Sequence, residues 1–200
     1  MGSAKANTVR NLESVLNILV GLALTSAVLR LILNVDGEVD VEVVRAALPL
    51  FLTFLATMVP FYHGAVRHLD VTYVEDGGKE VRRPALLCDF GMLFVEGCLL
   101  VALANALGQP IILAWGLIAL LGLDAIWGAV VQVALVKQPA SRTELRWAAL
   151  NTLAVLALVW VVLTGRVGAA GDWSNPLIYI ALVRTAVDYA WCWDCYFPKE

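Results

Sequence analysis

The stretch that decides the fold is Leu86–Asn105, LLCDFGMLFVEGCLLVALAN, which is apolar along most of its length. A helix of about 20 such residues is long enough to cross the hydrocarbon core of a bilayer. The stretch nevertheless carries two carboxylates, Asp89 and Glu96, and their spacing of nearly two helical turns places both on one face. An ionisable group at that depth costs roughly 2.5–3.5 kcal/mol on insertion scales, so we expect both acids to face protein or water.

The composition of the whole chain agrees with a membrane protein. Of the 200 residues, 60% are hydrophobic and only 16% are charged, whereas a soluble domain carries about a quarter charged residues. The formal net charge of −3 and the lack of a long basic run argue against nucleic-acid binding. We therefore expect residues 1–200 to form a single transmembrane helical domain in a lipid bilayer, without a cleavable signal peptide.

Apolar segments recur along the chain and predict an all-α polytopic membrane protein with six transmembrane helices. The second segment contains Pro49 and Pro60, each of which removes a backbone hydrogen bond and bends a helix. The six expected segments cover approximately residues 14–33, 43–62, 86–105, 111–136, 147–164 and 176–193.

The distribution of positive charge between the segments predicts the orientation. With six spans, one side of the membrane holds only Arg45 and Arg166 among the connecting lysines and arginines. The positive-inside rule therefore places both termini in the cytoplasm of a cell whose inner (plasma) membrane holds the protein. The basic residues assigned to the cytoplasmic side are Lys5, Arg10, Arg67, Lys79, Arg82, Arg83, Lys137, Arg142, Arg146 and Lys199.

The expected cytoplasmic link at 66–83 has the pattern of a short β-hairpin. Residues 71–74 and 79–83 flank a turn that contains Gly77 and Gly78. A single hairpin is marginally stable alone, so we expect it to rest on the bundle, on a neighbouring subunit or on a cytosolic protein partner. A solvated loop is an equally good interpretation of the same residues.

Several polar residues are expected to meet in the cytoplasmic half of the bundle, given a rise of about 1.5 Å per residue. Two of them, Tyr62 and His63, end the second segment, and the others interrupt the later apolar segments. These candidate site residues are Tyr62, His63, Asp89, Glu96, Asp124, Arg184 and Asp188.

The charges in this set do not balance, because four carboxyl groups face Arg184 as the one permanent cation. A low-dielectric site holds such a surplus only with added protons, water or cations. We therefore expect an oligomeric proton or monovalent-cation pathway of the channel or transporter type, with no other cofactor. In the alternative, Arg184 pairs with Asp188 and Asp89, Glu96 is neutral, and the protein is a non-transporting subunit or effector that docks a cytosolic or membrane partner.

Cys192 and Cys195 form a CxxC motif, which is typical of redox dithiols and of some metal sites. The expected cytoplasmic position is reducing, and no second CxxC supplies further zinc ligands, so this interpretation is the weaker one. The aromatic residues around the motif are typical of a helix end at the membrane interface. The sequence lacks P-loop, GxSxG and HExxH motifs, so it favours a function other than catalysis.

Overall fold

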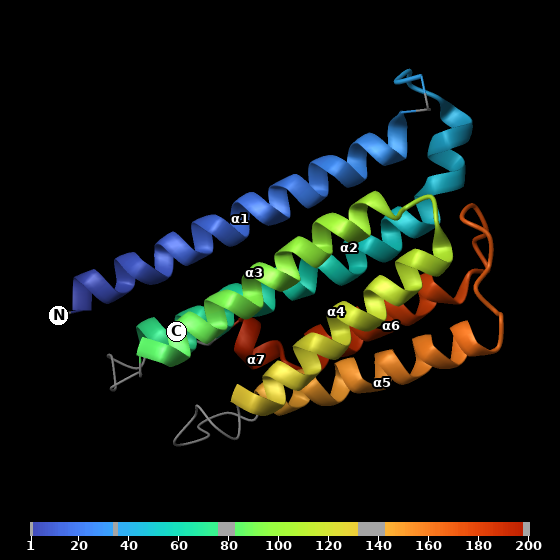
Figure 1. Cartoon of the computed structure of the whole chain (residues 1–200). Helices are drawn as coiled ribbons and strands as arrows, with labels where there is room; N and C mark the ends of the chain where they lie inside the picture. The colour runs from blue at the N-terminus through green and yellow to red at the C-terminus, as the bar shows by residue number, and fades with distance from the viewer. Residues whose placement is uncertain (1, 34–35, 76–82, 132–142, 198–200) are drawn as a thin grey trace.

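The computed structural model describes residues 2–33, 36–75, 83–131 and 143–197, and all regular elements among them are helical (Figure 1). The all-α prediction is therefore confirmed for the described part of the chain. The elements are α1 Gly2–Ile32, α2 Val41–Leu69, η1 Asp70–Glu75, α3 Arg83–Asn105, α4 Pro110–Val130, α5 Thr143–Leu163, α6 Pro176–Trp191 and α7 Trp193–Tyr196.

The helices α1 to α6 run alternately up and down an elongated bundle, and both chain ends lie at the same end of it (Figure 1). Helix α1 packs on α3 and α2, α4 packs on α3 and α5, and α6 packs between α2 and α5. Small residues allow close approach: a Cβ added at Gly97 of α3 would lie only 2.6 Å from Leu19 Cδ1 of α1. Packing through small residues is the usual basis of helix association in lipid.

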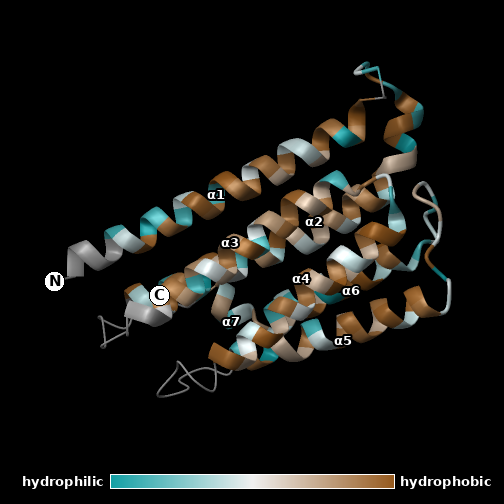
Figure 2. Ribbon diagram, viewed as in Figure 1, coloured by the Kyte–Doolittle hydropathy of each residue, from teal (hydrophilic) through white to brown (hydrophobic). Residues whose placement is uncertain are grey.

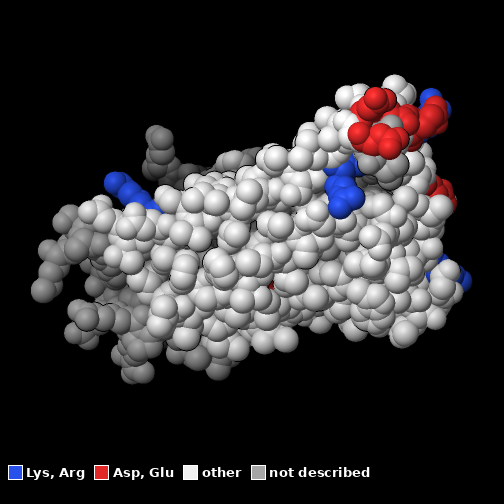
Figure 3. Space-filling view, turned by 45° about the horizontal axis from the view of Figure 1, so that its top comes forward, with Lys and Arg blue, Asp and Glu red and all other residues white. Residues whose placement is uncertain are grey.

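Five helical stretches are long and apolar enough, by length and composition, to cross a membrane. They are Asn7–Ile32, Val41–Val74, Leu86–Asn105, Pro110–Val130 and Glu144–Leu163. Apolar residues dominate the middle of these helices (Figure 2). On the face in Figure 3, charged side chains gather toward the ends of the bundle. Next to the start of α2 in the chain are the exposed acids Asp36, Glu38 and Glu42. This arrangement is that of a membrane-embedded bundle.

Five helices, and not the six predicted, have the length and composition of a membrane span among the described residues. Helix α6 has 16 residues and rises only about 24 Å at 1.5 Å per residue, which is less than the hydrocarbon thickness of about 30 Å. It buries Arg184 and Asp188 against other helices and exposes Leu182 and Val183 on its other face. Helix α6 therefore returns along the bundle as a shorter helix that is not one of the five candidate spans (Figure 1).

The predicted β-hairpin at 66–83 is also wrong. Residues 66–69 continue α2, and residues 71–74, expected as a strand, lie in the π-helical turn η1. The reason is tertiary: Leu69 and Tyr73 are spaced by one helical turn and are both buried, and the Tyr73 hydroxyl donates to Asp89. These contacts outweigh the strand propensity of the sequence VTYV. Residues 76–82 lie outside the described residues, and Arg83 begins α3.

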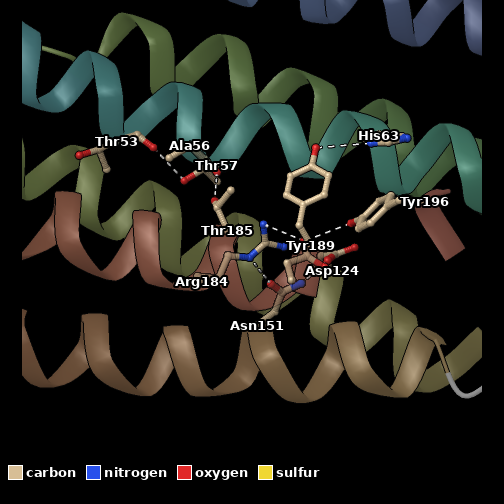
Figure 4. A network of polar contacts seen from close by, with 11 residues as sticks. Thr53, Ala56, Thr57, His63, Asp124, Asn151, Arg184, Thr185, Tyr189 and Tyr196 are labelled. Atoms are coloured by element: carbon tan, nitrogen blue, oxygen red, sulfur yellow. Dashed lines mark hydrogen bonds and ion pairs between the residues drawn. The ribbon is translucent and has the colours of Figure 1, made fainter. Parts of the chain in front are cut away.

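The prolines of α2 determine how α6 is attached. Pro60 lacks an N–H, so the carbonyl of Ala56 one turn earlier loses its usual helical partner. The hydroxyl of Thr185 on α6 donates to that carbonyl (Figure 4). Thr53 and Thr57 instead bond within α2, to the carbonyls of Pro49 and Thr53 at 2.9 and 3.0 Å. The kink at Pro60 thereby fixes α6 against α2.

Candidate functional site

A cavity of about 50 Å³ lies among α2 to α7, in the part of the bundle near α7 and the start of α5. Each of these six helices supplies at least one lining residue. Aromatic walls come from Phe61, Trp127, Trp147 and Tyr196. We call it the acidic cavity, after its charged and titratable lining residues His68, Glu96, Asp124, Glu144, Arg184 and Asp188.

One side of the acidic cavity is built around Arg184, which is only 5% exposed. Its Nε donates to Asn151 Oδ1 at 3.0 Å, and Asn151 Nδ2 in turn donates to Asp124 (Figure 4). Its Nη1 lies 3.5 Å from Asp188 Oδ2, which also accepts from the Tyr196 hydroxyl at 3.1 Å. This Arg184 network joins α4, α5, α6 and α7 through charged and amide groups.

The other side is built around His68, whose side chain is 10% exposed. Its Nε2 lies 3.4 Å from Asp89 Oδ2, and its Nδ1 lies 3.7 Å from Glu144 Oε1. Asp89 also accepts from Trp127 Nε1 at 2.8 Å and from the Tyr73 hydroxyl. This His68 network joins the end of α2 and η1 to α3, α4 and α5.

Four buried polar atoms in the cavity wall make no hydrogen bond within the residues that the structure describes. They are Glu96 Oε1, Trp147 Nε1, Arg184 Nη1 and Asp188 Oδ1. Glu96 is 1% exposed, so its carboxyl group has left water without gaining a protein donor at that oxygen. A buried polar atom left in this way costs roughly 1–3 kcal/mol, which points to an additional partner inside the cavity.

The two networks and Glu96 concentrate negative charge. Five carboxyl groups, those of Asp89, Glu96, Asp124, Glu144 and Asp188, lie around the acidic cavity and in its wall. Within the described residues, Arg184 and His68 form the ion pairs with these carboxyl groups. Such a surplus of buried acids is stable only if protons or cations offset it.

The structure brings together five of the seven site residues expected from the sequence: Asp89, Glu96, Asp124, Arg184 and Asp188. Asp89 does not pair with Arg184 directly; it bonds to His68, Tyr73 and Trp127.

The two other expected residues do not line the acidic cavity. His63 Nδ1 lies 3.4 Å from the Tyr189 hydroxyl, and its ring packs on Tyr196, a lining residue, with a centroid distance of 4.5 Å. The Tyr62 hydroxyl donates to Asn17 Oδ1 on α1 at 2.8 Å.

The residues of the site that sequence reasoning missed include His68, Glu144 and Asn151. His68 and Glu144 lie near the chain positions expected as cytoplasmic links, so their burial depends on α2 and α5 extending further than the apolar segments predict. Asn151 carried a usable signal, since an amide within the apolar segment 147–164 requires a partner in a membrane.

The CxxC motif lies at the junction of α6 and α7. Burial, together with the nearby Asp188 carboxylate, raises the pKa of the Cys192 thiol to about 12. A thiol in that state is a poor nucleophile and a poor metal ligand. Within the described residues, no group of three or more His, Cys, Asp or Glu side chains is placed to hold a metal ion.

Comparison with protein families, with curated proteins and with solved structures finds no significant match to this chain. The chemistry of the acidic cavity is therefore the basis for assigning a function.

Proposed function

We propose that this membrane protein takes up and passes protons or small monovalent cations at the acidic cavity. The observation that carries the proposal is the Glu96 carboxyl group, which is buried, lines the cavity and has an oxygen without a protein donor. Ionisable residues at membrane depth are rare because they are costly, and they commonly belong to ion or proton pathways.

The surroundings of Glu96 support this proposal. Asp124, Glu144 and Asp188 line the same cavity, so a positive species that enters it meets several carboxyl groups. Arg184 holds Asp188 and, through Asn151, Asp124. We propose that this network keeps part of the cavity closed while Glu96 exchanges its proton or cation. The kinked helix α2, which supplies Pro60 to the cavity wall, is the proposed moving element.

The orientation belongs to the same proposal. The alternating helices place both chain ends at one end of the bundle (Figure 1). Most lysines and arginines outside the expected spans fall on that side by sequence, and the other end carries the exposed acids Asp36, Glu38 and Glu42. By the positive-inside rule, we propose that the termini lie in the cytoplasm and that the membrane is the inner membrane.

A second candidate function is a non-transporting membrane subunit held together by buried charges. The observation in its favour is the Arg184 network, in which Asn151 bridges Asp124 and Arg184 by hydrogen bonds. Under this function the networks would serve only helix packing and the assembly of a complex.

The test compares two single substitutions after reconstitution into liposomes. Glu96→Gln removes the proposed carrier group, whereas Glu13→Gln makes the same chemical change on α1, outside the cavity lining. We expect flux of protons or of a monovalent cation through the wild-type protein, loss of that flux in Glu96→Gln, and normal flux in Glu13→Gln. Equal flux in all three proteins, or none through correctly inserted wild type, would refute the proposal and favour the second candidate.

A further inference from the structure

Four buried polar atoms of the cavity wall make no hydrogen bond within the described residues, although one of them, Arg184 Nη1, forms the 3.5 Å ion pair with Asp188 Oδ2. Two are donors, Trp147 Nε1 and Arg184 Nη1, and two are acceptors, Glu96 Oε1 and Asp188 Oδ1. All four residues line the acidic cavity and come from three different helices, α3, α5 and α6. Water both donates and accepts, so it can satisfy donors and acceptors in one cavity.

The cavity has the size that such waters need. A single buried water needs a cavity volume of about 10–15 Å³, and this cavity has about 50 Å³. It therefore has room for about three or four waters. Each buried water in a protein makes about three hydrogen bonds, so a short chain is enough to reach all four atoms.

We propose that the acidic cavity holds a chain of ordered waters joining Glu96 to Asp188, and that the species passed through it is a proton and not an alkali-metal cation. This inference rests on the proposed function and names its cargo. A proton moves along such a chain by transfer between neighbouring hydrogen bonds: one O–H bond forms as the next breaks, and atoms and charge balance at each water.

The size of the cavity favours the proton over a metal cation. A proton is passed from one water to the next, whereas an alkali-metal cation must itself enter a space of about 50 Å³ that the waters already fill. The charged or titratable groups around Glu96 are His68, Asp89, Asp124, Glu144, Arg184 and Asp188.

Gly64 offers a way to fill the cavity without touching the acids. A Cβ added there would lie 3.5 Å from the Tyr196 hydroxyl oxygen and 3.7 Å from Trp147 Cζ2, which are ordinary contact distances at the cavity wall. The larger side chain in Gly64→Val therefore occupies space assigned to water. Gly91→Val is the matched control, because nothing lies within 4 Å of the Cβ it would add on α3.

The experiment measures hydrogen–deuterium exchange of the protonated carboxyl group by infrared spectroscopy of the protein in lipid. The band of Glu96 is identified by its loss in Glu96→Gln. We expect this band to shift rapidly in D₂O in the wild type. In Gly64→Val the shift should be about tenfold slower, because the loss of one net hydrogen bond changes a rate by about that factor. Gly91→Val should exchange like the wild type. If Gly64→Val fails to insert, Gly64→Ala gives a smaller slowing in the same direction.

The outcomes separate the inference from the proposed function. Exchange that is equally fast in Gly64→Val and the wild type, or no carboxyl band lost in Glu96→Gln, would overturn the water chain. Flux of rubidium or sodium that depends on Glu96, with no proton flux, would keep the proposed function and overturn the proton as cargo. Proton flux lost in Glu96→Gln and lowered in Gly64→Val, but normal in Gly91→Val, would support both.

Discussion

Replacing Arg184 with methionine should destabilise the bundle more than any other single change in the acidic cavity. Methionine retains much of the length and flexibility of the arginine side chain but removes its charge and its hydrogen-bond donors. The substitution takes away the 3.0 Å hydrogen bond to Asn151 and the 3.5 Å ion pair with Asp188. Asp188 is 0% exposed, so bulk solvent does not compensate the carboxylate for the lost guanidinium.

The loss of unfolding free energy in Arg184→Met distinguishes a lost hydrogen bond from an uncompensated buried charge. Side-chain hydrogen bonds in a membrane protein average about 0.6 kcal/mol, so loss of the bonding alone would cost roughly 1 kcal/mol. Removing one partner of a buried ion pair costs about 3–5 kcal/mol, because an uncompensated charge remains. We expect the larger value, since Arg184 is the permanent cation among five surrounding carboxyl groups.

Reversible unfolding in detergent or bicelles, followed by tryptophan fluorescence, measures the free energy of unfolding in a double-mutant cycle. Asp188→Asn added to Arg184→Met removes the orphaned charge, so it should restore about 1–3 kcal/mol. Arg184→Lys should fall between the wild type and Arg184→Met, because it keeps the charge and loses the planar fork. A cost below about 1 kcal/mol for Arg184→Met, with no recovery in the double variant, would refute this electrostatic account.

Three further predictions follow from other contacts. Thr185→Val should lower the free energy of unfolding by about 1 kcal/mol, because the hydrogen bond to the Ala56 carbonyl is lost. In a Pro60→Ala background the backbone N–H of residue 60 is restored as a donor to that carbonyl, so Thr185→Val should cost less there. An equal cost in both backgrounds would contradict the reasoning. Gly97→Val should cost about 1–3 kcal/mol by crowding Leu19, measured by the same unfolding, whereas equal stability would show that α1 shifts freely. The pKa of Cys192 is raised to about 12, so the rate at which maleimide labels this thiol should rise about tenfold per pH unit from pH 7 to 10. A labelling rate that levels off near pH 8.5 in the folded protein would contradict a buried thiol.

The sequence predicted the acidic residues of the site better than the residues that bond to them, such as His68 and Asn151. Asp89, Glu96, Asp124, Arg184 and Asp188 stand out because a charge in an apolar helix requires an inward face. That energetic rule predicts that these side chains face the interior of the bundle. The structure adds how the charges are distributed between an Arg184 network and a His68 network, which linear spacing does not show.

The errors have a common physical origin at the ends of the helices. Residues 71–74 have strand propensity, but burial of Leu69 and Tyr73 and the bond to Asp89 keep this stretch helical. The sequence predicts His63, which ends the second apolar segment, as a site residue, but α2 extends to Leu69 and brings His68 to the cavity. At these positions the tertiary contacts override the local secondary-structure propensity, because a buried polar contact stabilises the fold by more than the few tenths of a kcal/mol that propensity contributes.

The sequence by itself determined that this chain is a helical membrane protein with acids hidden inside it, because lipid requires apolar helices of sufficient length and excludes unpaired charge. Only the tertiary structure decided that five described helices have the length of a span and that the shorter α6 is held by the carbonyl freed at Pro60. It also decided which acids share a cavity, because that depends on helix rotation and packing at small residues such as Gly97.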